Sequence, residues 1–555
     1  MFKERSLLRT LSIIITVVLL SFALTACGGG TAPDTAPPDE PKTDDTAPVV
    51  PDSDEEPQPA EEKVFTFIDS LHWINIDPRA SSDNDARITY MIYETLTRYN
   101  VPGSSDELVS PQLATSWEHT EDGLEWTFYL REGVKFHDGA DFNAEAVKMS
   151  FEKIQELDLS ASYLWYPIYE IEVVDDYTVK FYLEWAQPLD VMFSTMYSGW
   201  IISPTVLENT EEQFNQGIQS GTGPWVLDEY HKDERALFSR NDDYWGGWTE
   251  DQFDRIALEI VLDPATMVQM IQSGEIDGAI GILEEHIPLV DALPDYQTVI
   301  SSSFQSEHWN FNTGKPPLDD VRVRQALSYS FPYEDCAIAG GALVAPSYAG
   351  IPPGQIGYHP GAFQYTYDLE KARSLLKDAG YEDGFTLNFS NFTYWTQATE
   401  ACPVLWQTEL AKLNIELEIS ETLYETAWAI AMGGPESEGV HDVFRQLWWV
   451  AYPTAFDYLY TMYGCLEEDQ DILYELSYWC DWDFFDLILY ANELEGTDPA
   501  EAQAMYEAAI DILVEQAPSI WPRDILGLTV IRSDIQGYVN NPAYNLIYDF
   551  YQFTR

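Results

Sequence analysis

The feature that most restricts the fold of this chain is the interleaving of strand and helix patterns from Val64 onward. Over Trp126–Leu130 every second residue is strongly apolar, which is the period of a half-buried strand, and residues 176–183 repeat the pattern. Residues 368–380 have a capping aspartate, an apolar stripe and a final glycine, and residues 500–516 form a second amphipathic pattern, so both predict helices. Strands and helices that alternate in this way indicate an α/β fold.

Net charge excludes one class of partner. The chain has 94 acidic and 28 basic residues and a net charge of −66; residues 1–26 carry +2 and residues 28–63 carry −9, so −59 falls on the remaining body. Such a field repels phosphate backbones, so we expect no nucleic-acid partner. A saline habitat is compatible with this acidity, since salt screens the self-repulsion.

Sequence motifs of catalysis are absent from the chain. It contains no G-x-S-x-G, H-E-x-x-H, Walker A or G-x-G-x-x-G pattern. The eight histidines are scattered and there is no C-x-x-C pair, so neither a zinc site nor another metal site is expected. We therefore expect neither an enzyme nor a cofactor.

The N-terminus predicts export. A short basic segment precedes a stretch from Thr10 to Ala26 without charge, a length that fits an export signal and could marginally fit a membrane span. Leu24–Cys27 resembles the bacterial lipobox, which implies signal cleavage after residue 26 and a lipid on Cys27. An uncleaved anchor is the alternative. Either way, the body is expected outside the cytoplasm and held to the membrane.

A linker and a disulfide are also predicted. Residues 27–63 are rich in Pro, Thr, Asp and Glu with few apolar side chains, which is typical of a disordered tether. An exported chain permits disulfides, and Cys465 and Cys480, which enclose a short segment, are the preferred pair.

A series of sequence blocks resembles one known family. Residues 111–153, "PQLATSWEHTEDGLEWTFYLREGVKFHDGADFNAEAVKMSFEK", are similar to the signature block of the peptide/nickel-type (family 5) solute-binding proteins of ABC importers, relatives of oligopeptide- and dipeptide-binding proteins. Seven further blocks occur in the order of the family: "MIYETL", "GTGPWVLDEY", "NDDYWGG", "MIQSGEIDGAI", "PPLDDVRVRQALSYSF", "YDLEKARSLLKDAGY" and "DWDFFDLI".

This resemblance implies a two-lobed periplasmic-binding-protein fold of type II, in the large peptide-binding class, over residues 64–555. Lobe I is expected at about 64–303 and 523–555, and lobe II at about 304–522. The lobes would close on a small peptide-like solute, and the closed form would be recognised by the ABC permease subunits in the membrane. We expect a monomer.

The resemblance also implies ligand-binding residues. His441–Tyr452 aligns without gaps with a cleft-lining strand, on which Arg445 matches an arginine that meets the carboxylate end of the ligand. Trp448 matches a pocket tryptophan, and Tyr424 falls where relatives carry another. Strand parity places Trp449, not Trp448, on the face of Arg445, so both tryptophans are candidates. A structural pairing of Arg445 with one of the many acids is the alternative.

Ala451 departs from the family pattern. Peptide-binding relatives have an aspartate here that pairs with the ammonium group of the ligand. A buried ammonium without a partner costs several kcal/mol. A free N-terminus is therefore not expected to bind in the usual way.

Thr222 and Asn312 match cleft-adjacent positions in the family, with turn and crossover chemistry as the alternative, and Ser82 and Asn84 match loop positions that meet the ligand backbone in peptide binders. Trp395 and Trp73 are further candidates, and a plain surface or core position would explain each of them equally well.

Other functions remain open from the sequence. Aromatic faces stack on sugar rings, so an oligosaccharide is the alternative ligand, and a nickel chelate has less support. A secreted hydrolase or an adhesin is the alternative of a different class.

Overall fold

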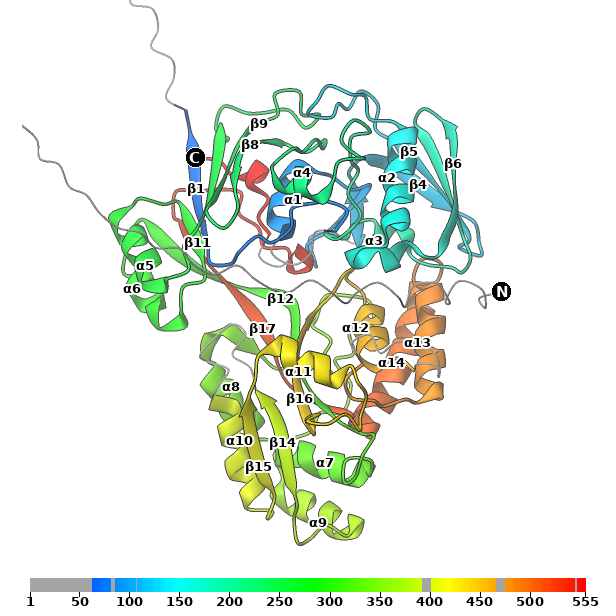
Figure 1. Ribbon diagram of the computed structural model, residues 1–555, viewed down its shortest axis with the longest axis vertical. Helices are drawn as coiled ribbons and strands as arrows, with labels where there is room; N and C mark the ends of the chain where they lie inside the picture. The colour runs from blue at the N-terminus through cyan, green and yellow to red at the C-terminus, as the bar shows by residue number, and fades with distance from the viewer. Residues whose placement is uncertain (1–61, 81–84, 106, 392–400, 466–474, 545–546) are drawn as a thin grey trace, which may run out of the picture. The chain divides into compact units, whose positions relative to one another are not determined.

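The computed structural model describes residues 62–80, 85–105, 107–391, 401–465, 475–544 and 547–555 (Figure 1). Its largest sheet has eleven strands. Along the sheet they are β15 (Glu416–Glu421), β14 (Thr386–Asn391), β16 (Val443–Trp449), β12 (Tyr296–Phe311), β17 (Ser519–Arg532), β11 (Gly278–Ile280), β1 (Val64–Asp69), β10 (Arg255–Ile260), β9 (Arg235–Arg240) and β8 (Trp225–His231), with β13 (Val344–Ala345) paired to β17.

Smaller sheets lie outside this one. The first has four strands in the order β4 (Ala114–His119), β5 (Glu125–Leu130), β7 (Thr178–Leu183) and β6 (Ile168–Asp175). The second pairs β2 (Thr97–Tyr99) with β3 (Val109–Pro111). Strands β5 and β7 confirm the two predicted strands, because apolar alternation over half a dozen residues is a local signal.

The predicted helices are also present. Asp368 accepts the backbone N–H of Lys371 and starts α9 (Leu369–Ala379), and Gly380 ends it in the left-handed conformation. The second is α14 (Pro499–Gln516). The remaining α-helices are α1 (Ala86–Ile92), α2 (Ala144–Leu157), α3 (Leu189–Met192), α4 (Glu211–Asn215), α5 (Pro264–Ser273), α6 (Ile287–Asp291), α7 (Val321–Ser330), α8 (Tyr333–Gly340), α10 (Ala401–Ala411), α11 (Tyr424–Ala431), α12 (Ala455–Tyr463) and α13 (Trp482–Leu494). The fold is therefore α/β, as predicted.

Strands β12 and β17 join the two halves of the large sheet. They are antiparallel neighbours in register from Tyr296 opposite Arg532 to Asn310 opposite Ser519, with irregularities beside Ser302 and Glu307. Figure 1 shows this pair running between the group that contains β1 and the group that contains β14 and β16. Side chains on β12 and β17 therefore lie between these two groups of strands.

Two hydrophobic cores flank this connection. One is built on Trp309, Trp406 and Phe389 and packs α7–α10 against β12, β14 and β16. The larger core contains side chains of β1, β5 and α2, and also of α12, α13 and α14. Helices that follow β16 in the chain thus pack into the same core as the N-terminal strands.

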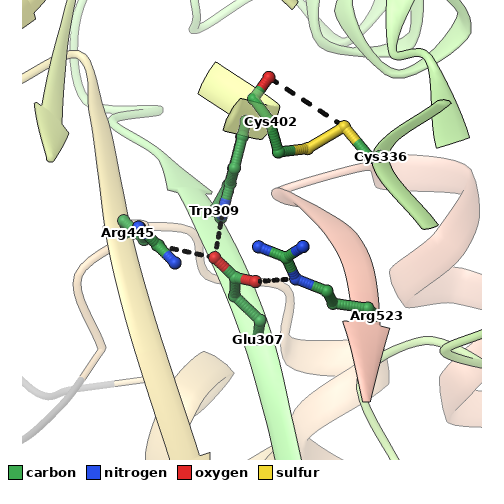
Figure 2. Close-up of a disulfide and its surroundings, with 6 residues drawn as sticks. All are labelled: Glu307, Trp309, Cys336, Cys402, Arg445 and Arg523. Atoms are coloured by element: carbon green, nitrogen blue, oxygen red, sulfur yellow. Dashed lines mark hydrogen bonds and ion pairs between the residues drawn. A yellow bond between two sulfur atoms is a disulfide. The ribbon is translucent and has the colours of Figure 1, made fainter. Parts of the chain in front are cut away.

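Two disulfides are formed. Cys465 and Cys480, the pair expected from the sequence, join the end of α12 to the segment before α13. Cys336 and Cys402 join α8 to α10, and this second pairing was not predicted (Figure 2). No helix among the described residues has the length and apolar character that a membrane crossing requires.

Candidate ligand-binding site

The two tryptophans at the end of β16 have different partners. Strand β16 pairs with β12, so that Trp448 lies opposite Ser306 and Trp449 opposite Gln305. Trp448 donates its indole N–H to Asp457 on α12 at 3.0 Å. Trp449 donates to the hydroxyl of Tyr197 at 2.9 Å, which connects β16 to a segment expected in lobe I. Adjacent strand residues point to opposite faces, and both indoles are only half buried.

Ala451 lies at a second connection of the same kind. Its carbonyl accepts a hydrogen bond from Thr195 Oγ1 at 2.6 Å, and its N–H donates to Asp457 Oδ2 at 3.2 Å. Residue 451 is an alanine and has no carboxylate, but the carboxylate of Asp457 accepts a hydrogen bond from its backbone N–H. Burial raises the pKa of Asp457 to about 7, despite the hydrogen bonds from Trp448 and Ala451.

Arg445 belongs to a buried charged cluster with Glu307, Arg523 and Trp309 (Figure 2), to which Asn391 is also bonded. Glu307 accepts from Arg445 Nε at 2.5 Å, from Arg523 Nε at 2.6 Å and from Trp309 Nε1 at 2.8 Å. Arg445 also donates to Asn391 Oδ1 at 3.1 Å. Arg445 is thus paired with an acid of the chain, which is the alternative that the sequence left open.

The electrostatics of this cluster centre on Glu307. Burial by itself would raise the pKa of this carboxyl, but the charges of Arg445 and Arg523 and the hydrogen bonds outweigh it, so the pKa falls to about 2. Glu307 is therefore ionised at neutral pH. The cluster contains two guanidinium groups and one carboxylate, and has an excess positive charge.

Tyr424 lies beside β16 at the start of α11. Its ring centroid is 5.7 Å from that of Trp428 and 6.4 Å from that of Phe444, a residue of β16. The side chain is half buried. The structure therefore brings Tyr424 to β16, but against Phe444 rather than against the two tryptophans of the strand end.

Three other candidates lie away from the end of β16. Trp73 is completely buried and donates its indole N–H to Asp69 in the core around β1. Thr222 is buried beside Glu94. Asn312 holds the turn after β12 by donating to the carbonyl of Pro435 at 3.0 Å and accepting from Gly314 N at 3.2 Å. Trp73 and Asn312 thus use their side-chain polar atoms in bonds within the chain.

The remaining candidates, Trp395, Ser82 and Asn84, lie outside the described residues, as does Cys27. Within the described ranges, no group of three or more His, Cys, Asp or Glu side chains is arranged to hold a metal ion.

A separate cavity of about 260 Å³ lies among residues of the N-terminal and C-terminal segments, including Glu94, Arg98, Trp245 and Asp549. Burial raises the pKa of Glu94 to about 7, although Trp245, Thr222, Tyr244 and Gln112 stabilise its charged form. Of the predicted ligand-binding residues that the structure describes, none lines this cavity.

Sequence reasoning missed Glu307, Arg523 and Asp457. The signal available for the first two was a charged residue close to large aromatic residues in a strand, in "FQSEHWNF" and "SIWPRDIL". Such residues are rare in strands unless they are paired or functional.

The fold and these features define the class of the protein: an extracytoplasmic binding protein with two α/β lobes. Residues 109–470 match the model of the bacterial extracellular solute-binding proteins, family 5 (middle region), and the chain belongs to this family. Its members are binding proteins and not enzymes, so this protein is a solute-binding protein without catalytic activity.

Relatives and solved structures agree with this assignment. The chain is 28% identical to the dipeptide-binding protein of Escherichia coli K12 over 487 residues, which cover 81% of this chain and 87% of that protein. It is 29% identical to di/tripeptide-binding protein 2 of Pseudomonas aeruginosa UCBPP-PA14 over 482 residues, which cover 81% of this chain and 87% of that protein. The fold resembles the periplasmic binding protein DppA from Helicobacter pylori in complex with the peptide STSA (TM-score 0.73, 24% identity, 89% of this chain and 98% of that chain).

Proposed function

We propose that this protein is the substrate-binding lipoprotein of an ABC importer, which captures a peptide or peptide-like solute between its lobes and delivers it to the permease. The family membership carries the proposal, and the names of the dipeptide- and di/tripeptide-binding relatives support a peptide. In this proposal lobe I consists of residues 64–303 and 523–555, lobe II consists of residues 304–522, and the protein is a monomer.

The contacts at the end of β16 support a ligand site there. Trp449 meets Tyr197 and Ala451 meets Thr195, so this strand end touches the segment expected in lobe I. A ligand bound beside Trp448 and Trp449 would contact both lobes and stabilise the closed form. Aromatic contact contributes on the order of 1 kcal/mol per ring beyond the area it buries.

The test starts with the natural ligand. Mild denaturation of the purified protein should release a peptide that mass spectrometry identifies, whereas an oligosaccharide would favour the alternative ligand. Calorimetry with that ligand should then show lower affinity for Trp448→Ala and Trp449→Ala. Trp482→Ala is the matched control, because Trp482 is 53% exposed on α13 and is not part of the proposed site.

Two outcomes would count against this site. Loss of melting temperature in both variants with unchanged affinity would make these tryptophans core residues. Release of no solute, and no binding of any peptide, would contradict the proposed function itself.

Membrane attachment is a separate part of the proposal. We propose that Cys27 carries the lipid and that the acidic segment up to residue 63 tethers the body to the membrane. Labelled palmitate fed to expressing bacteria should enter the wild type and not the variant Cys27→Ser. Equal labelling of the two would contradict lipidation at Cys27.

A further inference from the structure

The cavity of about 260 Å³ is formed by segments from both ends of the folded body. Helix α1, strands β2 and β8, the segment after β9 and residues 548–552 all contribute to its lining (Figure 1). Exposed residues such as Gly246 and Gln552 belong to this lining, so the cavity reaches the surface. A cavity of about 150 Å³ is large enough for a six-membered ring, so this one has room for a small molecule.

Aromatic side chains form much of the wall. They include Tyr90, Trp225, Tyr244, Trp245 and Tyr551. The face of an aromatic ring has a partial negative charge and attracts cations. Two rings of this wall already contact cations of the chain: the guanidinium of Arg98 lies 5.4 Å from the ring centroid of Tyr90, and that of Arg131 lies 3.8 Å from the ring centroid of Trp245.

Glu94 is a buried acid on this wall, and the groups that stabilise its charged form are neutral. Glu307, which is equally buried, has two arginine partners. Arg98 lines the same cavity as Glu94 but pairs with Asp549 at 2.9 Å, so that these two charges cancel. When Glu94 is ionised, the lining therefore has an excess of one negative charge, which favours a ligand with one positive charge.

The hydrogen bonds of Glu94 restrict the kind of cation. A carboxylate has about four lone-pair sites. Trp245 Nε1 lies 3.1 Å from Oε1 and 2.9 Å from Oε2, and the hydroxyl of Tyr244 and the amide of Gln112 also donate to Oε1. Few acceptor sites thus remain for the N–H groups of a primary amine. A methylated ammonium group needs no acceptor, because it binds through its charge and through contact with ring faces.

Trp225 adds a second requirement. It lines the cavity and is 1% exposed, and its buried indole N–H has no hydrogen-bond partner among the described residues. A buried donor that stays unpaired loses the free energy of its hydration. A ligand oxygen could accept this hydrogen bond. Water could accept it too, but water would leave Glu94 without a counter-charge.

We infer that this cavity binds a small methylated ammonium compound with a hydroxyl group, of the choline class, as a second ligand of the protein. The ammonium group lies against the ring faces beside Glu94, and the hydroxyl oxygen accepts the N–H of Trp225. The site is separate from the end of β16 and does not rest on the proposed function.

Calorimetry at pH 8 compares choline with two analogues that each lack one feature. In 3,3-dimethylbutan-1-ol a carbon replaces the charged nitrogen, and in propyltrimethylammonium a methyl group replaces the hydroxyl. This pH keeps Glu94 ionised, and a constant ionic strength limits binding of cations to the acidic surface. The wild type should bind choline roughly tenfold more tightly than the neutral alcohol and about two- to tenfold more tightly than propyltrimethylammonium.

Variants of the two polar groups should each remove one preference. Glu94→Gln keeps the size of the side chain but not its charge, so the preference for choline over the neutral alcohol should largely disappear. Trp225→Phe removes the N–H, so the preference for choline over propyltrimethylammonium should disappear. Asp524→Asn is the matched control, because Asp524 is also a buried acid with a pKa of about 7 but does not line the cavity; this variant should keep both preferences.

Equal affinity of the wild type for choline and the neutral alcohol, or binding of neither, would overturn the inference and leave water as the occupant. An unchanged preference in Glu94→Gln would overturn it as well. The comparison of ligands on the wild type needs no variant, so it decides the question even if the variants do not fold. Peptide capture is unaffected by any of these outcomes, since release of the natural ligand tests it separately.

Discussion

Replacing Glu307 by glutamine should destabilise the ligand-free protein strongly at neutral pH. The pKa of Glu307 is about 2 in the folded protein against 4.5 for an unperturbed glutamate, a difference of about 2.5. At 1.36 kcal/mol per pKa unit, its ionised form contributes roughly 3 kcal/mol to the free energy of unfolding. Removing one partner of a buried ion pair costs about 3–5 kcal/mol, which agrees.

The pH dependence follows from the direction of the shift. Because the pKa of Glu307 is lowered by folding, its contribution is complete above the pKa of the unfolded chain and disappears as the pH falls towards 2. The deficit of Glu307→Gln relative to the wild type should therefore be about 2 kcal/mol smaller at pH 3 than at pH 7.

Urea unfolding followed by tryptophan fluorescence measures this deficit, since the chain has 18 tryptophans. Asp320→Asn is the matched control. It removes the charge of a carboxylate that pairs with Arg322, whose side chain is 46% exposed, and asparagine keeps the N-cap of α7. This control should lose less than about 1 kcal/mol. Equal midpoints for Glu307→Gln and the wild type at pH 7, or the same deficit at pH 3, would refute the reasoning.

Three further predictions concern the strand end and the disulfide. Folding raises the pKa of Asp457 to about 7, so the stability that its protonated carboxyl contributes is lost as the pH rises from 4 to 7. Asp457→Asn should therefore have a higher melting temperature than the wild type at pH 8 but not at pH 4, and an equal difference at both pH values would contradict this. Trp449→Phe and Tyr197→Phe should each lower the calorimetric affinity for the co-purified ligand, and the double variant no further, whereas additive losses would show that the bond between them is irrelevant. Without reductant, the double variant Cys465→Ser/Cys480→Ser should have a free energy of unfolding in urea roughly 3 kcal/mol below that of the wild type, because the disulfide closes a short loop. An unchanged midpoint would contradict this expectation.

Local signals in the sequence were sufficient for much of the fold. The strand at Glu125–Leu130 and the helix at Leu369–Ala379 were predictable, because their periodicity and capping depend on neighbouring residues. The two-lobed architecture came from the order of family blocks over the whole chain. Periodicity alone does not say that α12–α14 pack in the core that contains β1.

The charged cluster could not be predicted in this way. Arg445 and Glu307 are 138 positions apart, and Glu307 and Arg523 are 216 apart, so no local pattern links them. They meet because β12 lies between β16 and β17 in the sheet. The carboxylate that contacts Ala451 is near it in the sequence, since Asp457 is only six positions further on. The contact was still not predictable, because it depends on how α12 folds back on the strand.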